Sequence, residues 1–488
     1  MRESQTVEKA RCALGAQLAA NRRAVGYSQA ELAPLTGYSR STIANVETGR
    51  QHVPRDFWER ADAAVNAGGV LAAANDEVEA AARHEREETA RAARAARQAQ
   101  AEQWRAQHAK GAAQQQRAAG SGWTETIDQA HAVAASLWSG DPGDTDTAAE
   151  DASPAGTAVA LRWLIAPPDP SAARLDGWRL IGSGDLARLH GVRRCLKDID
   201  NAHGGGAALP MAVSYVRREI PPLLDGRYDD ATGRGLFEVA AEFQHDVGWM
   251  AYDADRQDLA ACYFAHALRF AHAAGNRLLG GRILAAMSHQ AIYLGHIAQA
   301  IDLARAARAG TTQLATPHAL AMLAAMEACA LAAAGETKLC QQALGDAETA
   351  LTGNLGDGPE PEWLDFDEGG YWGHAARVYR DLGEPERAEQ CAERSVAQCL
   401  TGHRRTHSQR STIQAAARLQ LGDVDAAAAV GEEVVREAWN LHSGHVFGEV
   451  SALARAIAAV KTPAAAGFLD QARELLAARA AGAAVAGS

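Results

Sequence analysis

The first fifty residues alternate apolar and polar positions at helical spacing, and glycines interrupt the pattern. Apolar residues recur with this period over 8–24, which predicts a first helix. Ser28 opens a second, short helix and forms a capping box with Glu31 three residues later. After the turn glycine Gly37, Ser39 caps a third helix. Two short helices joined through a glycine-containing turn predict a helix-turn-helix unit.

From residue 183 onward the pattern is almost entirely helical, and from 232 it repeats. In the first copy, small residues at Gly248, Ala260 and Ala267 accompany the aromatic Phe264. This spacing resembles a degenerate tetratricopeptide (TPR) unit. Each such unit buries its face only against its neighbours, so we expect a TPR-like α-solenoid with a concave surface. Five copies are anchored at Val247, Met287, Glu327, Ala375 and Gln414.

The chain between these regions reads as a helix followed by a linker. Residues 76–120 are Ala, Arg, Glu and Gln almost throughout, which predicts a long connecting helix. Residues 121–182 are expected to form a partly flexible linker, acidic over 139–157, with a short strand or extended tether over 157–170. The remaining predicted domains are the helix-turn-helix domain (1–75), a helical pair capping the array (183–231) and the repeats (232–488).

Composition supports an all-α fold. The chain of 488 residues is 47% hydrophobic but only 6% aromatic, and roughly a quarter is alanine, the best helix former. The net charge of −12 is uneven. Residues 1–122 hold 17 basic and 14 acidic residues, net +3, which leaves 48 − 17 = 31 basic and 60 − 14 = 46 acidic residues, net −15. Any nucleic-acid contact is therefore expected through the first segment, because phosphate contacts are electrostatic.

Several classes of protein are disfavoured. The seven cysteines form no CxxC pair, and the chain has neither a signal-peptide core nor an uncharged apolar stretch of about 18 residues. We expect a cytoplasmic, nucleoid-associated protein with no membrane contact. No catalytic triad or dyad pattern is visible, so we expect no enzyme activity, no cofactor and no metal. Four histidines are candidate metal ligands, but we favour the interpretation that they lie in a solvated loop: His403, His407, His442 and His445.

Residues 18–50 resemble the phage-repressor-type (XRE-family) helix-turn-helix domain. The match needs no gap and covers about 65 residues, with 54–68 continuing as a fourth helix. Pro34 departs from the family pattern, because it falls inside the first helix of the motif and can kink it. The resemblance is carried by Arg22, Gly26, Ser28, Gln29, Glu31, Leu32, Ala33, Gly37, Ser39, Ile43, Glu47, Gly49 and Arg50.

The second helix of such a unit lies in the DNA major groove, with its N-terminal residues at the base edges. Arg40, Ser41 and Asn45 occupy those positions here, and Arg and Asn pair bidentately with guanine and adenine. By the resemblance, an Arg22–Glu47 ion pair is structural. Gln29, Thr42 and Arg50 are the candidate phosphate contacts, and Leu18, Leu32, Ile43 and Val46 are the expected core.

The repeat template also indicates which side chains line the concave surface. Arginine and amide side chains there are suited to a peptide's carboxylate and backbone, although Trp and Tyr at helical spacing are also ordinary packing residues. The candidate groove residues are Trp249, Tyr252, Arg282, His289, Tyr293, Arg377, Arg380 and Gln409.

This layout resembles the large actinobacterial regulators of the XRE type. The resemblance implies a sequence-specific transcriptional regulator that binds double-stranded DNA as a homodimer. Its repeats would sense a peptide, a small molecule or a protein partner and mediate oligomerisation. The alternative is a TPR scaffold that acts through protein–protein interaction and carries a vestigial DNA-binding domain.

Overall fold

The computed structural model describes residues 5–108, 123–139, 152–177, 179–312, 314–353, 360–460 and 462–486. It is all-α, as predicted. Within these ranges no strand forms, and the extended chain contributes two isolated β-bridges, Arg174 with Tyr228 and Leu180 with Arg227. The chain divides into two compact units: an N-terminal unit (residues 1–93, together with 420–422) and a repeat unit (94–419 and 423–488).

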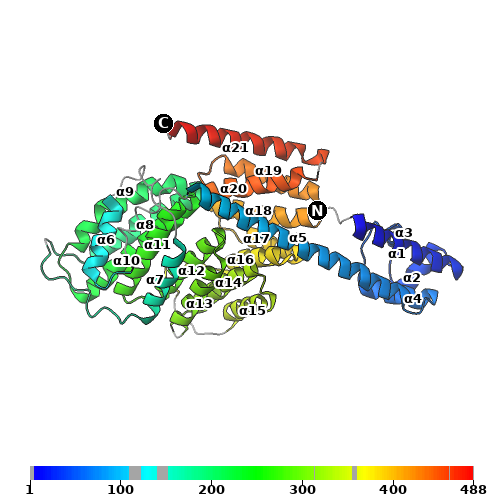
Figure 1. Cartoon of the computed structure of the whole chain (residues 1–488), viewed down its shortest axis with the longest axis horizontal. Helices are drawn as coiled ribbons and strands as arrows, with labels where there is room; N and C mark the ends of the chain where they lie inside the picture. Colours follow the sequence, from blue (N-terminus) through cyan, green and yellow to red (C-terminus); the bar gives the residue numbers. More distant parts are fainter. Residues whose placement is uncertain are drawn as a thin grey trace. The chain divides into compact units, whose positions relative to one another are not determined.

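The N-terminal unit packs short helices around one small core (Figure 1). Leu18, Leu32 and Ile43 are fully buried and Val46 is 2% exposed, so the expected core is confirmed. Phe57, from the fourth helix, completes it. The helices are α1 (Gln5–Ala24), α2 (Gln29–Thr36), α3 (Arg40–Glu47), α4 (Arg55–Val65) and the beginning of α5 (Val70–His108).

The two short helices begin where the capping residues place them. The Ser28 hydroxyl accepts from the Glu31 backbone N–H, and the Glu31 carboxylate accepts from the Ser28 N–H at 2.7 Å, which completes the capping box. The Ser39 hydroxyl accepts from the Thr42 N–H at 3.1 Å. Pro34 does not end α2, which continues to Thr36, because Pro34 is exposed in the last turn of the helix.

Two glycines let α1 lie against the C-terminal end of α3. A Cβ on Gly15 would stand 2.3 Å from the Val46 carbonyl oxygen. Gly49, at φ +74°, would place a Cβ 2.7 Å from the Cys12 sulfur. The backbone of α3 therefore has a fixed support from α1, with no room for a side chain between them.

The repeat unit packs consecutive helices in pairs (Figure 1). The pairs are α10–α11, α12–α13, α14–α15 and α16–α17, and at the C-terminal end α19, α20 and α21 pack against one another. The helices are α6 (Ile127–Ser139), α7 (Ala152–Ile165), α8 (Ser183–His203), α9 (Gly205–Leu224), α10 (Asp230–Asp253), α11 (Gln257–Ala273), α12 (Arg277–Tyr293), α13 (Ile297–Thr311), α14 (Pro317–Ala334), α15 (Thr337–Thr352), α16 (Glu368–Leu382), α17 (Pro385–Ala397), α18 (Arg404–Gln420), α19 (Val424–Ala438), α20 (Gly444–Ala458) and α21 (Ala466–Ala486), with a short 3-10 turn, η2 (Pro463–Ala465).

The small and aromatic positions of the first repeat meet as their spacing predicts. A Cβ on Gly248 in α10 would lie 2.5 Å from the ring of Phe264 in α11. Ala260 and Ala267 are fully buried in the same interface. Alanine and glycine thus set the close approach of the paired helices, which explains much of the alanine content.

The segment expected to be a strand or extended tether over 157–170 is helical up to residue 165, so that prediction was wrong. Trp163 in α7 is fully buried, because it fills the space left open by Gly280 and Gly310. The Arg277 guanidinium lies 4.0 Å from its ring centroid. Most of the acidic stretch 139–157 lies outside the described residues.

The last repeats return to the first, so the array closes on itself. Arg405 in α18 donates to both oxygens of Asp200 in α8, at 2.6 and 2.8 Å. The Ser443 hydroxyl, at the start of α20, donates to Asp253 in α10 at 2.7 Å. The loop before α20 also bonds by its backbone to the α8–α9 turn, through His442. We call these contacts the closure. Because of the closure, the surface expected to be concave and open faces the interior of the repeat unit.

One helix among the described residues is long and apolar enough to cross a membrane, judged by length and composition alone. It is α14, and 61% of it is buried inside the protein, against α13, α15 and α16. The sequence contains no uncharged apolar stretch of about 18 residues here, because the charged Glu327 interrupts α14. A buried core helix meets the same test, so this is weak evidence for a membrane span.

Candidate DNA-binding surface and central cavity

The exposed face of α3 carries the side chains predicted to read bases. Arg40, Ser41 and Asn45 are exposed, whereas Ile43 and Val46 on the opposite face are buried in the core. The capped start of α3 projects Arg40 from the first turn, and Asn45 lies about one turn further along. The structure therefore places these three residues together on one accessible helix surface.

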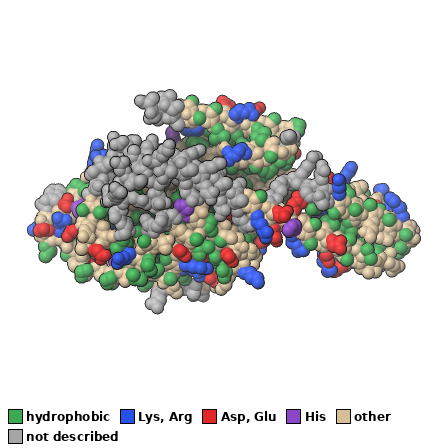
Figure 2. Space-filling model, in the orientation of Figure 1, with side chains coloured by type: hydrophobic (Ala, Val, Ile, Leu, Met, Phe, Trp, Pro, Cys, Tyr) green, Lys and Arg blue, Asp and Glu red, His purple; other side chains and the backbone are tan. Residues whose placement is uncertain are grey.

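The two arginines of this surface are unpaired within the described part of the chain. Neither Arg40 nor Arg50 makes a side-chain hydrogen bond or ion pair with any described residue, and both are exposed. Asn45 Nδ2 contacts Gln51 Oε1 at 3.4 Å, a weak contact that a base edge can replace. Figure 2 shows acidic and basic side chains interspersed over the visible face of this unit, without a large patch of one sign.

The hydroxyls of Ser41 and Thr42 gather at the N-terminus of α3. Their oxygens lie 2.7 and 3.0 Å from the Ser39 hydroxyl, respectively. Thr42 is half-buried and Ser41 is exposed. Hydroxyls beside a helix N-terminus suit a phosphate oxygen, and of the two Ser41 is the more accessible.

Arg22 and Glu47 form a bidentate pair that braces the end of α3. Arg22 Nε and Nη2 donate to the two Glu47 oxygens at 2.6 and 3.1 Å, and a third hydrogen bond joins Arg22 to the Tyr27 carbonyl. Burial raises the pKa of Glu47, but the hydrogen bonds from Arg22 and Gln29 outweigh it and lower the pKa overall. Gln29 Nε2 donates to Glu47 at 2.7 Å, so this predicted phosphate ligand belongs to the brace.

Sequence reasoning did not single out Gln51, which extends the polar surface beyond α3. It is exposed beside Asn45 and follows Gly49, whose positive φ turns the chain. The sequence signal for Gln51 is a polar residue just after the turn that ends α3. This feature is too common to identify a DNA-contacting residue.

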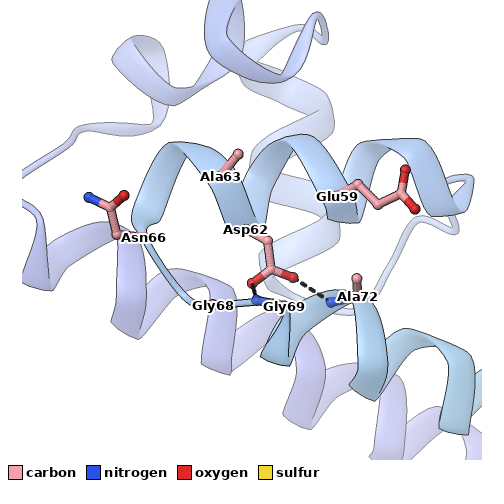
Figure 3. Close-up of a pocket in the computed structure, with 7 residues that line it drawn as sticks. All are labelled: Glu59, Asp62, Ala63, Asn66, Gly68, Gly69 and Ala72. Atoms are coloured by element: carbon pink, nitrogen blue, oxygen red, sulfur yellow. Dashed lines mark hydrogen bonds between the residues drawn. The ribbon is translucent and has the colours of Figure 1, made fainter.

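A shallow depression of about 490 Å³ lies where α4 meets α5 (Figure 3). Its acidic residue Asp62 points from α4 to the first turn of α5 and accepts from the backbone N–H groups of Gly69 and Ala72, at 3.0 and 2.6 Å. Both carboxylate oxygens are thereby used. The depression is a helix junction and offers no free catalytic group beyond the exposed Glu59, which pairs with Arg55.

Comparison with known proteins agrees with this geometry. A family model described as a helix-turn-helix domain matches residues 13–74, which span α2, α3, α4 and most of α1. No curated protein matches the chain. The protein therefore carries a helix-turn-helix domain of the DNA-binding class.

A central cavity of about 290 Å³ lies inside the closed array of the repeat unit. Its walls come from α8, α10, α12, α14, α16, α18 and α20, the helices on the inner side of each pair. The loop before α16 adds Asp365 and Phe366. Six of the eight predicted groove residues line it: Trp249, Tyr252, Arg282, His289, Arg377 and Gln409.

The other two predicted groove residues are placed elsewhere. Tyr293 is 42% exposed, and its hydroxyl donates to Asp255 at 3.2 Å. Arg380 pairs with Asp381 at 3.1 Å and is not part of the cavity wall. The repeat register is therefore right for most inner positions. Tyr293 lies behind the wall, with its ring 5.4 Å from that of Tyr252 and 5.3 Å from that of His445.

Three histidines of the cavity, His245, His289 and His374, have pKa values far below the ordinary value. Burial, followed by the charge of nearby arginines, lowers the pKa of His245 and of His374 to about 3. Burial, and then Arg377, lowers the pKa of His289 well below its ordinary value. Over the described residues, no three His, Cys, Asp or Glu side chains converge as metal ligands would.

The polar lining from α18 was missed by sequence reasoning, apart from Gln409. Arg405 and Arg410 lie in the cavity wall, as do Lys197 and Asp200 of α8. Because α8 precedes the repeats, no repeat spacing in the sequence predicts its contact with α18. The available indication was the basic stretch of α18, which holds four arginines with no acidic residue between Glu393 and Asp423.

Proposed function

We propose that the protein is a sequence-specific transcriptional regulator of the phage-repressor (XRE) type. The observation that carries the proposal is the unpaired, exposed Arg40 with Ser41 and Asn45 on a rigidly braced α3. Arg and Asn are the side chains that read guanine and adenine bidentately in the major groove. The regulator would act on DNA in the cytoplasm and without catalysis of its own.

We further propose that the repeat unit, a TPR-like array of the actinobacterial type, senses an effector in its central cavity. The cavity supports this, because it gathers charged and aromatic side chains from six helices. Homodimerisation is part of the proposal: one small domain buries only about 600–1,000 Å² on DNA, and two half-sites supply affinity and specificity. Light scattering that finds a monomer both with and without DNA would contradict homodimerisation.

The test of DNA recognition is the double variant Arg40→Ala with Asn45→Ala. Genome-wide mapping of bound DNA with the intact protein first supplies the site. Each lost bidentate contact is expected to cost about 1–3 kcal/mol, so affinity at physiological salt should fall at least about 30-fold. Arg83→Ala is the matched control, since Arg83 is exposed on α5 away from α3.

Unchanged binding by the double variant would contradict regulation through α3 and favour the scaffold alternative. An equal loss in the Arg83→Ala control would mean that charge alone, and not base reading, sets the affinity. A chain that maps to no defined site would leave the helix-turn-helix as a vestigial module.

A further inference from the structure

The central cavity contains more cationic than anionic side chains. Five cations line it, against four carboxylates: Lys197, Arg282, Arg377, Arg405 and Arg410 against Asp200, Asp246, Asp253 and Asp365. The histidines described above add no charge at neutral pH. What decides the ligand chemistry is therefore which of these charges already have partners.

Every carboxylate of the cavity is satisfied by the protein. Asp200 binds Arg405, and Asp365 binds Lys197 at 3.0 Å. Asp246 binds Arg193, outside the cavity wall, at 2.6 Å. Asp253 accepts from the Gly205 backbone N–H and the Ser443 hydroxyl, both at 2.7 Å.

Three arginines of the cavity have no carboxylate within ion-pair distance in the described part of the chain. Arg282 and Arg410 each donate one hydrogen bond, to the backbone carbonyls of Trp363 and Ser395. Arg377 makes no side-chain hydrogen bond with any described residue. Glu449 on α20 lies outside the cavity wall, and the charge of Arg377 is one of the influences that lower its pKa. Its Oε1 contacts His445 at 3.4 Å, its buried Oε2 has no hydrogen-bond partner in the described part of the chain, and no ion pair with Arg377 forms there.

Tyr252 supplies a second, independent observation. It lines the cavity and is 3% exposed, yet its hydroxyl has no hydrogen-bond partner. Burial raises the pKa of Tyr252 well above its ordinary value, and Arg377 is the main opposing influence. The hydroxyl is therefore a neutral donor within the electrostatic reach of Arg377. Leaving such a group unpaired in a folded protein is unfavourable, which a ligand would correct.

The walls beside Tyr252 are aromatic. The ring of Trp249 lies 5.3 Å from that of Tyr252 and 5.3 Å from that of His289, both edge-on. Met322 and Met326 of α14 add flexible apolar surface to the cavity. The charged and apolar groups together suit a compact molecule with an anionic end and an apolar body. A cavity of about 290 Å³ has no room for a protein domain.

We propose that the central cavity binds a small organic oxyanion, a carboxylate or phosphate carried by an apolar body. Arg377 provides the ionic contact, the Tyr252 hydroxyl donates a hydrogen bond, and Trp249 packs on the apolar part. A guanidinium matches both oxyanions through parallel N–H donors. The inference rests on the proposed effector-sensing role of the repeat unit and specifies the class of its ligand.

The experiment measures binding of benzoate and phenyl phosphate to the full chain by calorimetry, with neutral benzamide as the control ligand. We expect one or both anions to bind and benzamide not to bind; the preferred anion distinguishes a carboxylate from a phosphate ligand. Arg377→Gln is expected to lower the affinity at least tenfold. Arg436→Gln, at an exposed arginine of α19 outside the cavity wall, is expected to leave it unchanged.

If Arg377→Gln fails to fold, the conservative variant Tyr252→Phe takes its place in the experiment. Tyr252→Phe should weaken anion binding several-fold. Equal binding of benzamide, no binding of either anion, or unaltered affinity in both Arg377→Gln and Tyr252→Phe would overturn the proposal. DNA binding by the same samples is measured separately. Loss of DNA recognition with anion binding intact would overturn the regulator and leave the oxyanion site standing.

Discussion

At the scale of single residues, the DNA-binding surface depends on side chains that never face DNA. Glu47 receives three hydrogen bonds, two from Arg22 and one from Gln29, and Gly15 gives α1 its close contact with α3. These groups fix the position of α3, and with it the direction of Arg40. A reading helix displaced by even about 1 Å loses the geometry of a bidentate base contact.

Glu47→Gln is expected to destabilise the N-terminal unit by about 1.5–3 kcal/mol at pH 7, the usual value of hydrogen bonds to a charged group. The native pKa of Glu47 is lowered, so its contribution is present above the unfolded-state pKa and is lost as pH falls through the native pKa. The difference between wild type and variant should thus shrink in acid below about pH 4. Hydrogen exchange of the α3 amides in the full chain measures it, and a difference independent of pH would contradict the ionic explanation.

Gly15→Ala is expected to destabilise the same unit by about 1–3 kcal/mol, because its Cβ would overlap the Val46 carbonyl. Gly191→Ala is the contrasting control: it lies within α8 with open space around its Cβ, and should stabilise the repeat unit by roughly 0.5–1 kcal/mol through helix propensity. Protection of the α3 and α8 amides reports the two effects. Increased protection of the α3 amides in Gly15→Ala, alongside that of the α8 amides in Gly191→Ala, would contradict the prediction. It would mean that α1 and α3 can move apart without loss of stability.

At the scale of elements, short helices were predictable where a local signal marks their ends. Ser28 and Ser39 define α2 and α3, and the small and aromatic pattern of Gly248 and Phe264 defines α10 and α11. The assignment of α7 failed because its Val, Leu and Trp residues suit a strand equally well. Contact of Trp163 with Gly280 and Gly310, distant in sequence, decides in favour of the helix.

The junction of α4 and α5 is held by the carboxylate of Asp62, which is 5% exposed. Asp62→Ala removes both of its hydrogen bonds to the start of α5 and should cost about 1–2 kcal/mol, as for loss of a helix cap. The amides of residues 69–73 should then exchange faster in the full chain. Glu59→Ala, which alters only a surface pair in the same depression, should leave them nearly unchanged.

At the scale of the whole repeat unit, the closure converts an open array into a cavity. Sequence patterns predicted the inner surface but not its enclosure, because the closing contacts join residues about 200 positions apart through polar groups that carry no period. Burial, with a smaller contribution from the charges of Asp253 and Asp246, raises the pKa of Asp200 to about 6 in spite of Arg405. A buried ion pair often adds little net stability, and we expect this one to fix the register of the closure.

Arg405→Leu is expected to destabilise the repeat unit by about 3–5 kcal/mol at pH 8, since it leaves Asp200 buried and unpaired. The native pKa of Asp200 is raised, so the folded form holds its proton more tightly than the unfolded form, and stability falls as pH rises through that range. The loss should consequently be smaller at pH 5. Urea unfolding at the two pH values measures it.

Asp200→Asn is the complementary variant, because it keeps the hydrogen-bonding shape but leaves the buried Arg405 guanidinium without its carboxylate. It should also destabilise the repeat unit at pH 8, by roughly 1–3 kcal/mol, and less than Arg405→Leu does, because the asparagine oxygen still accepts a hydrogen bond from Arg405. Unchanged stability in both variants would contradict a structural role for the ion pair.

The closure also sets an order of events during synthesis. The buried core of the helix-turn-helix is formed by residues up to Ala82, whereas the cavity wall is incomplete until His445 has been added and Arg405 has bound Asp200. At about 5–20 residues per second, the ribosome needs roughly 20–70 s to produce the chain between these points. On the proposed function, a chain that ends within the last repeats would keep its DNA-reading surface but lack a complete effector cavity, so its DNA binding should no longer respond to the effector.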